Sequence, residues 1–194
     1  IPRGISCPLP LASYQHGTIA EKIDVPSFNN YEANIGKIFA GCGYVTCMPD
    51  YIGLGTSPGL HPYVHARSEA DAALDLMRAA RVLQDSLTFN LNDQLFLFGY
   101  SQGGHATMAL HKEIETNYPD EFQVTISAPM SGPYDLSGVQ ADVITGMEPY
   151  PTPGYLPYVV FAYQSVYGNF YTDISELFVS PYDVDLPPLF DGTY

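Results

Sequence analysis

The residue with the clearest chemical role is a serine inside a glycine-rich turn. Gly99, Ser101 and Gly103 form the pattern G-x-S-x-G within GYSQGG, after an apolar run and before a helical pattern. In a sharp strand-to-helix turn, a strained backbone lifts the serine Oγ above the sheet, where it can attack a carbonyl group. A side chain at either glycine would collide with neighbouring backbone. The pattern therefore predicts a nucleophile at Ser101; the alternative is a glycine-rich turn capped by serine.

Two backbone amides are predicted to bind the negative charge that forms on the attacked oxygen. One is the N–H of Gln102, at the start of the helix that follows Ser101. The other is the N–H of Thr18, because the second donor in this arrangement comes from a loop after an earlier strand. Gly17 would let the backbone approach the substrate. The alternative for this segment is an ordinary glycine turn with a structural histidine, His16.

The segments that must position these residues alternate between strand and helix patterns. Apolar runs indicate buried strands at residues 11–15, 44–48, 95–98 and 123–128. Apolar residues at every third or fourth position predict three helices. The first lies between a start signal at 27–30 and glycines at 41 and 43 that end it. The second covers 68–87 and is capped by Ser68, and the third covers 103–117. Residues 90–93 are expected to form a turn. This alternation predicts an α/β fold with a mostly parallel sheet and helices on both faces.

Length and charge restrict the classes of function. With 194 residues and 46% hydrophobic content, the chain is long enough for one domain with a substantial core. A net charge of −14 repels phosphate backbones and argues against nucleic-acid binding. The sequence has no apolar run of about 18 residues that could span a bilayer. A chain that begins at Ile1 fits a processed, exported protein, so a secreted or periplasmic location is expected, although a trimmed chain would look the same.

Three cysteines, Cys7, Cys42 and Cys47, leave at least one without an intrachain partner. A bridge between Cys42 and Cys47 would suit an exported protein. Cys47 lies in an apolar strand pattern, however, where a free buried thiol is commoner, and we favour that interpretation. The cysteines do not have the spacing of metal ligands, and no metal or organic cofactor is implied.

Four segments together resemble a known group of enzymes: YQHGT, PDYIGLG, an alanine-rich helix with RAAR, and GYSQGG. Over about residues 12–135 the chain is similar to the secreted lipases and esterases of the α/β-hydrolase superfamily. The resemblance implies hydrolysis of a small-molecule or lipid ester through an acyl-enzyme on Ser101. It also implies that Tyr51 borders the active-site mouth, although a structural role for that turn is equally open. His16 and Tyr100 are further predicted to contact substrate.

The sequence changes in character near residue 146, where proline and tyrosine become frequent and helical patterns weaken. We therefore expect residues 1–145 to form a partial α/β-hydrolase core and residues 146–194 to form a cap or lid. Aromatic residues of this segment, Tyr158, Phe161 and Tyr163, would supply an apolar wall for the substrate. The alternative is an irregular structural excursion.

No histidine of the sequence qualifies as the general base. In enzymes with this turn the order is serine, then an acid, then histidine. His111, the last histidine, lies ten residues after Ser101 on the same predicted helix. His105 is expected at the rim of the site, and His61 and His65 flank Pro62 in a loop, which excludes a zinc-binding helix.

We therefore expect the acid, the base and further strands to lie outside these 194 residues, so that the sequence is a segment of a longer enzyme. Asp135 follows a strand where a few relatives place their acid, but a structural role is commoner. Two other functions stay open. A serine peptidase of the same fold usually has GWSYGG at this turn, and this chain has no tryptophan. A non-catalytic binding protein could have kept the turn and lost the base.

Overall fold

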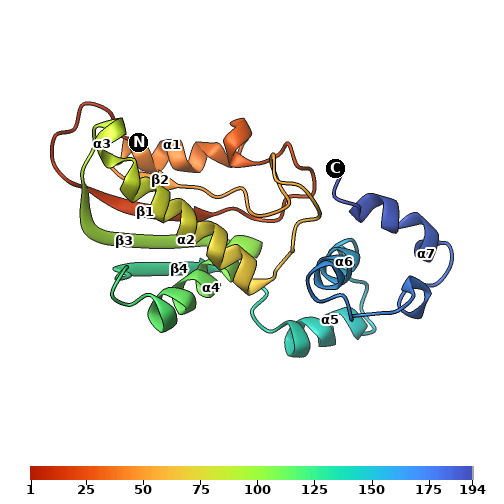
Figure 1. Ribbon diagram of the computed structural model, residues 1–194. Helices are drawn as coiled ribbons and strands as arrows, with labels where there is room; N and C mark the ends of the chain where they lie inside the picture. Colours follow the sequence, from red (N-terminus) through yellow and green to blue (C-terminus); the bar gives the residue numbers. More distant parts are fainter. Residues whose placement is uncertain (194) are drawn as a thin grey trace.

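Four strands form a single parallel sheet in the computed structural model, which describes residues 1–193. Tyr194, the last residue of the predicted cap, lies outside the described residues. The strands are β1 (Leu9–Gln15), β2 (Val45–Cys47), β3 (Leu91–Tyr100) and β4 (Ile126–Met130). Their order in the sheet is β2-β1-β3-β4, so the chain crosses over β1 between the second and third strands (Figure 1). Gln15 at the end of β1 pairs with Gly99 near the end of β3.

Helices cover both faces of this sheet. The long helices α2 (Ala66–Val82) and α4 (Gln102–Asn117) pack on one face, and α1 (Ala33–Gly41) packs on the other. Each of the three connects two successive strands, as right-handed β-α-β units require. The predicted α/β class, with a parallel sheet and helices on both faces, is therefore confirmed.

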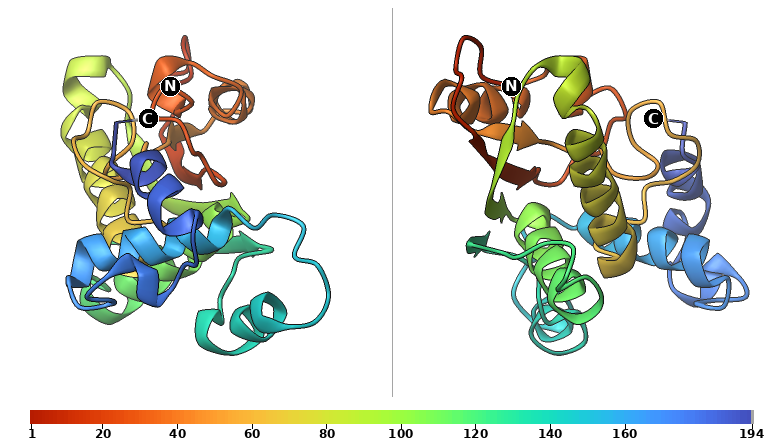
Figure 2. Two further views of the ribbon diagram at one scale, coloured as in Figure 1. Left: turned by 90° about the vertical axis from the view of Figure 1, so that its right-hand side faces the viewer. Right: turned by 60° about the vertical axis from the view of Figure 1, so that its left-hand side comes forward.

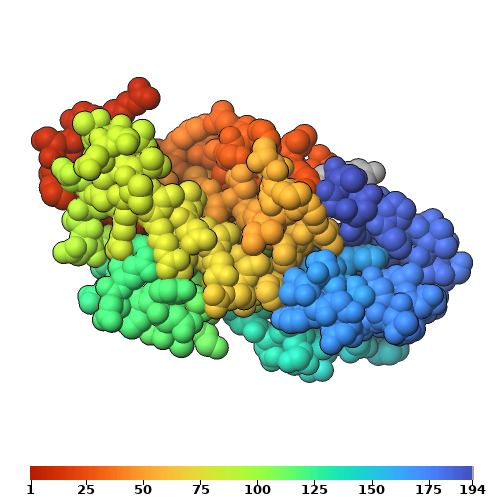
Figure 3. All heavy atoms as spheres, in the orientation of Figure 1, coloured from red at the N-terminus to blue at the C-terminus, as the bar shows by residue number. Residues whose placement is uncertain are grey.

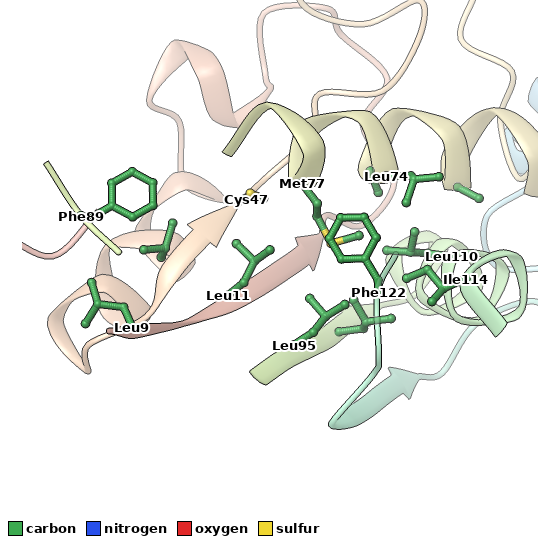
Figure 4. Packing of buried hydrophobic residues seen from close by; sticks show 14 residues of the cluster. Leu9, Leu11, Cys47, Leu74, Met77, Phe89, Leu95, Leu110, Ile114 and Phe122 are labelled. Atoms are coloured by element: carbon green, nitrogen blue, oxygen red, sulfur yellow. The ribbon is translucent and has the colours of Figure 1, made fainter. Parts of the chain in front are cut away.

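The main core lies between the sheet and the two long helices. Leu11 and Leu95 point from neighbouring strands toward Met77 of α2, and Leu110 and Ile114 of α4 close the layer beside them (Figure 4). These side chains alternate along each strand with residues of the opposite face, because successive residues of a strand point to opposite sides. Burial of this apolar area from water holds α2 and α4 against the sheet.

Aromatic contacts hold α1 on the opposite face. Phe39 of α1 stacks on Phe98 of β3, with ring centroids 4.3 Å apart, and Tyr14 of β1 lies 5.1 Å from the same ring. The Tyr14 hydroxyl donates to a carboxylate oxygen of Glu32, just before α1. Both faces of β3 are therefore covered, which explains its continuous apolar run.

Several predicted boundaries are wrong, including that of the last strand, which was expected at 123–128 and is β4 at Ile126–Met130. The expected turn at 90–93 is the start of β3, because the Leu9 N–H donates to the Asn90 carbonyl and extends the pairing to β1. The expected cap, Ser68, lies inside α2; His65 caps the helix and accepts the Ser68 N–H on its ring. The predicted helix over 68–87 also divides at Leu83 into α2 and the short α3 (Gln84–Leu87).

The prediction of a free thiol at Cys47 is confirmed. All three cysteines are free; Cys7 and Cys42 are exposed, and Cys47 is buried in the core between β2 and α2. Burial raises the pKa of the Cys47 thiol to about 12.

The C-terminal segment is more helical than its sequence pattern suggested. It contains α6 (Tyr155–Tyr167), with Pro157 in the first turn, where its missing N–H costs nothing. Short helical elements surround it: η2 (Leu136–Gln140) and α5 (Ala141–Thr145) before it, and η3 (Ile174–Glu176), α7 (Tyr182–Asp185) and η4 (Pro187–Phe190) after it. In Figure 2 this segment lies in front of the sheet when the molecule is viewed from its right-hand side.

Tyrosine packing joins this segment to the rest of the chain. Tyr158 of α6 stacks on Tyr63 with ring centroids 4.3 Å apart and an angle of 6°. Val64 and Ala162 complete the buried cluster. In space-filling representation the C-terminal residues adjoin the loop before α2 (Figure 3). Among the helices of residues 1–193, none is long and apolar enough to cross a membrane.

Leu110→Ala should lower the free energy of unfolding by about 2–5 kcal/mol, because it leaves a cavity between α4 and the sheet. Leu110 is fully buried, whereas Met108 on the same helix is 44% exposed. Met108→Ala is therefore the matched control and should change stability by about 0.5 kcal/mol or less. Urea unfolding of both variants measures the difference, and equal stabilities would contradict this description of the core.

Candidate active site

Ser101 occupies the single residue between the end of β3 and the start of α4, in a strained conformation. Its φ and ψ angles are 60° and −123°, which side-chain-bearing residues rarely adopt and which costs about 1–3 kcal/mol. Neighbouring hydrogen bonds hold the residue there. Its N–H donates to the Met130 carbonyl of β4 at 2.9 Å, and its carbonyl accepts from the N–H groups of Gly104 and His105. This is the geometry expected of a nucleophile elbow.

Glycines make the sharp bend at Ser101 possible. A Cβ on Gly103 would overlap the Gln15 carbonyl at the end of β1, and a Cβ on Gly99 would overlap the carbonyl oxygens of Gln15 and Gly103. Gly17 differs, because an added Cβ would meet the Tyr100 carbonyl oxygen at 3.5 Å, an ordinary contact. The protein itself therefore requires glycine at 99 and 103, but it imposes no such requirement at position 17.

Two backbone N–H groups near the elbow have no internal acceptor. Neither the Thr18 N–H nor the Gln102 N–H donates to another atom within residues 1–193. The Thr18 side chain is held separately, with its Oγ1 2.9 Å from the Tyr63 hydroxyl. Because Gln15 touches Gly103, the loop after β1 and the first turn of α4 start from adjacent points. The two amides thus have the availability that an oxyanion requires.

The loop that carries Thr18 is supported by buried aromatic rings. His16 is fully buried and donates from Nδ1 to the Gly17 carbonyl at 2.7 Å. Burial lowers the pKa of His16, which keeps the ring neutral. Tyr51 is also buried and lies against this ring, with centroids 4.3 Å apart. The structure therefore places His16 and Tyr51 beneath the loop and not on a substrate-facing surface.

Ser101 opens into a pocket of about 210 Å³ between the ends of β3 and β4 and the helix α6. Tyr63, Val64, Tyr155 and Val159 form its aromatic and apolar wall, and the other lining residues are Ser131, Gly132, Pro133, Leu136, Gln140, Ile144 and Tyr150. No local sequence pattern predicted this wall, because the wall combines the loop before α2 with a helix whose apolar pattern is weak.

Two predicted substrate contacts lie elsewhere. Phe161 does not line the pocket and stacks on Phe190 and Phe178, with centroids 5.1 and 6.2 Å away. Tyr100 is 59% exposed and does not line the pocket. Of the other aromatic residues expected at the wall, Tyr158 donates to the Ile19 carbonyl at 3.1 Å. Tyr163 donates to the Val64 carbonyl at 3.2 Å.

Within the described residues, no histidine lines the pocket that contains Ser101. His111 lies 3.2 Å from Glu115, one turn further along α4. Asp135 caps η2 by accepting the N–H groups of Gly138 and Val139, which is a structural role. Neither residue lines the pocket that contains Ser101.

His61 belongs to a buried hydrogen-bonded group behind the elbow. Its Nδ1 donates to the Ile52 carbonyl at 2.8 Å, and its Nε2 accepts from the side-chain amide of Gln102 at 2.7 Å. Burial is the main cause that lowers the pKa of His61 to about 4. A neutral ring with its proton on Nδ1 satisfies both hydrogen bonds.

Comparisons with known proteins agree with this geometry. A family model described as secretory lipase matches residues 35–176. The structure of the rice cell wall degrading esterase LipA from Xanthomonas oryzae has a TM-score of 0.88 and 36% identity, over 97% of this chain and 51% of that chain. Candida antarctica lipase A shares the fold, with a TM-score of 0.63 and 20% identity over 88% and 40% of the two chains. No curated protein matches. The chain thus spans about half the length of LipA.

Gly103→Ala should lower the free energy of unfolding by about 3 kcal/mol or more. Overpacking against side chains costs about 1–3 kcal/mol, and here the new methyl group would overlap backbone of β1, which cannot rotate away. Gly41→Ala at the end of α1 is the control, because its Cβ would meet no atom within 4 Å. Denaturant unfolding compares the two, and a Gly103→Ala protein as stable as the control would refute the packing of the elbow.

Stability should fall as the pH is lowered from about 6.5 to 4. The unfolded chain binds a proton at His61 in this range and the folded chain does not, so unfolding becomes easier. The shift from 6.5 to about 4 corresponds to about 3 kcal/mol at pH 4. Unfolding curves of wild type and His61→Gln over this range should diverge as the pH falls, with the wild type losing more. Parallel pH profiles would contradict the buried, neutral His61.

Proposed function

This chain belongs to the secretory lipase family, and we propose that the protein hydrolyses carboxylic esters with Ser101 as the nucleophile. The single observation that carries the proposal is the strained Ser101, which lines a pocket and is followed directly by the unpaired N–H of Gln102. Because the chain spans 51% of LipA, the activity proposed is that of the whole protein.

Ser101 Oγ attacks the ester carbonyl and forms a tetrahedral intermediate whose oxygen carries the negative charge. The N–H groups of Thr18 and Gln102 donate to that oxygen. Loss of one such donor typically costs about 3 kcal/mol of transition-state stabilisation. The alcohol then leaves, and water releases the acid from the acyl-enzyme.

The general base is a histidine from outside residues 1–194, oriented by a carboxylate that also lies outside them. It takes the proton of Ser101 and returns it to the leaving alcohol. The absence of histidine from the lining of the Ser101 pocket, within the described residues, supports this assignment.

The substrate is an uncharged ester, either of a small molecule or of a lipid. Support comes from the tyrosine and aliphatic wall of the pocket and from the net charge of −14, which disfavours anionic substrates. Residues 146–194 act as a cap over residues 1–145, since α6 supplies Tyr155 and Val159 to the wall. The family description supports export to a secreted or periplasmic location.

A non-catalytic binding protein is the second candidate, favoured by the pocket's lack of a histidine among the described residues. Such a protein would keep the elbow and bind an ester without cleaving it. The two candidates differ in one measurable property, the reactivity of Ser101 toward a fluorophosphonate, which requires an activated serine.

In the full-length protein, a fluorophosphonate should label Ser101, and Ser101→Ala should abolish labelling and lower ester turnover by about a million-fold. Ser86→Ala, an exposed serine of α3, is the control and should retain both properties. Mass spectrometry of the labelled peptide identifies the modified residue. An unlabelled wild-type protein, or full turnover by Ser101→Ala, would exclude the serine hydrolase.

A further inference from the structure

Glu69 is a carboxylate with no exposed surface in the first turn of α2, directly behind the elbow. Charged residues are almost never fully buried unless they are paired. The partners of Glu69 all belong to the first turn of α4: Oε1 accepts from the Gln102 side-chain amide at 2.8 Å, and Oε2 lies 2.7 Å from His105 Nδ1. The carboxylate thus joins α2 to the start of α4.

The donors and acceptors of this cluster fit one arrangement. The Gln102 amide nitrogen has two hydrogens, of which one goes to Glu69 and the other to Nε2 of His61. His61 holds its own proton on Nδ1, toward the Ile52 carbonyl. The amide of Gln102 therefore cannot rotate without breaking both of its hydrogen bonds, and its oxygen has no partner among the described residues.

The side chain and the backbone N–H of Gln102 therefore have separate surroundings. Its side chain is fixed by Glu69 and His61 in the interior, while its backbone N–H is unpaired and lies one residue after Ser101. The fixed side chain restrains the Cα atom of Gln102, and the hydrogen bonds from Gly104 and His105 to the Ser101 carbonyl orient the peptide plane that carries the N–H. A misplacement of about 1 Å at such a donor can cost on the order of 100-fold in rate.

We propose that Glu69 is a positioning residue, which acts through the side chain of Gln102 to aim the Gln102 backbone N–H at the oxyanion. The inference rests on the proposed function and adds a residue to it that touches neither the substrate nor Ser101. A negative charge beside the first turn of α4 also favours this helix end electrostatically. Glu69 thereby couples α2 to the reaction centre.

Glu69→Gln tests the proposal in the full-length protein. Gln102 and His105 donate to different oxygens of Glu69, so the new amide, with its single oxygen, can accept from only one of them in this geometry. We expect kcat to fall about 10- to 100-fold with KM nearly unchanged, since the lost interaction acts mainly in the transition state. Asp71→Asn is the control: it removes an exposed carboxylate of the same helix, paired with Arg67 on the surface, and should leave kcat unchanged.

Active-site titration with a fluorophosphonate separates positioning from a structural role. If Glu69 positions the donor, nearly all Glu69→Gln molecules label, but each labels about 10-fold more slowly or worse. If Glu69 only stabilises the fold, fewer molecules label, those that do react at the wild-type rate, and the proposal is overturned. Should Glu69→Gln fail to fold, Gln102→Met cuts the same link while it retains the backbone N–H, and the same slow labelling is expected.

The failure of this inference is distinguishable from failure of the proposed function. A wild-type protein that does not label at Ser101 refutes the hydrolase itself. A wild-type protein that labels, together with a Glu69→Gln or Gln102→Met variant of unchanged labelling rate and kcat, refutes only the role of Glu69.

Discussion

The active site depends on one close backbone contact, in which the last carbonyl of β1 rests against Gly103 in the first turn of α4. No side chain fits between them, so the loop after β1 and the start of the helix are forced to begin at neighbouring points. The strained Ser101 and the unpaired N–H of Gln102 lie directly before Gly103, and the unpaired N–H of Thr18 follows three residues after Gln15. Two segments distant in sequence, the loop after β1 and the turn before α4, thus lie side by side because Gly103 has no side chain.

Local patterns predicted most of the fold but not the surroundings of the site. Strands, helices and the elbow follow from residue periodicity and from glycine, both of which are short-range signals. The burial of His16 and Tyr51 could not be predicted, because it depends on contacts between rings that are far apart in the sequence. The helix α6 could not be predicted either, because apolar residues lie on most of its sides and form no single apolar stripe. The burial of Glu69 does have a sequence signal, because Glu69 lies four residues before Ala73 and so on the apolar face of α2. An acidic residue at such a position indicates a buried partner.

The loop that carries Thr18 also has contacts with the C-terminal segment. Tyr158 of α6 donates to the Ile19 carbonyl, and it stacks on Tyr63, whose hydroxyl meets the Thr18 side chain. The same helix provides Tyr155 to the pocket wall. Residues beyond 146 therefore contribute to the shape of the pocket and to the support of the loop, so the two parts of the chain share one site.

The buried thiol of Cys47 gives the molecule an internal reporter of unfolding. Thiol reagents act on the thiolate, which is scarce at Cys47 in the folded chain, where burial also blocks access; Cys7 and Cys42 remain accessible. Alkylation at Cys47 would therefore measure how often β2 separates from α2, at a position one strand away from the end of β1. Transient separation of β2 from α2 can thus be followed chemically without an introduced probe.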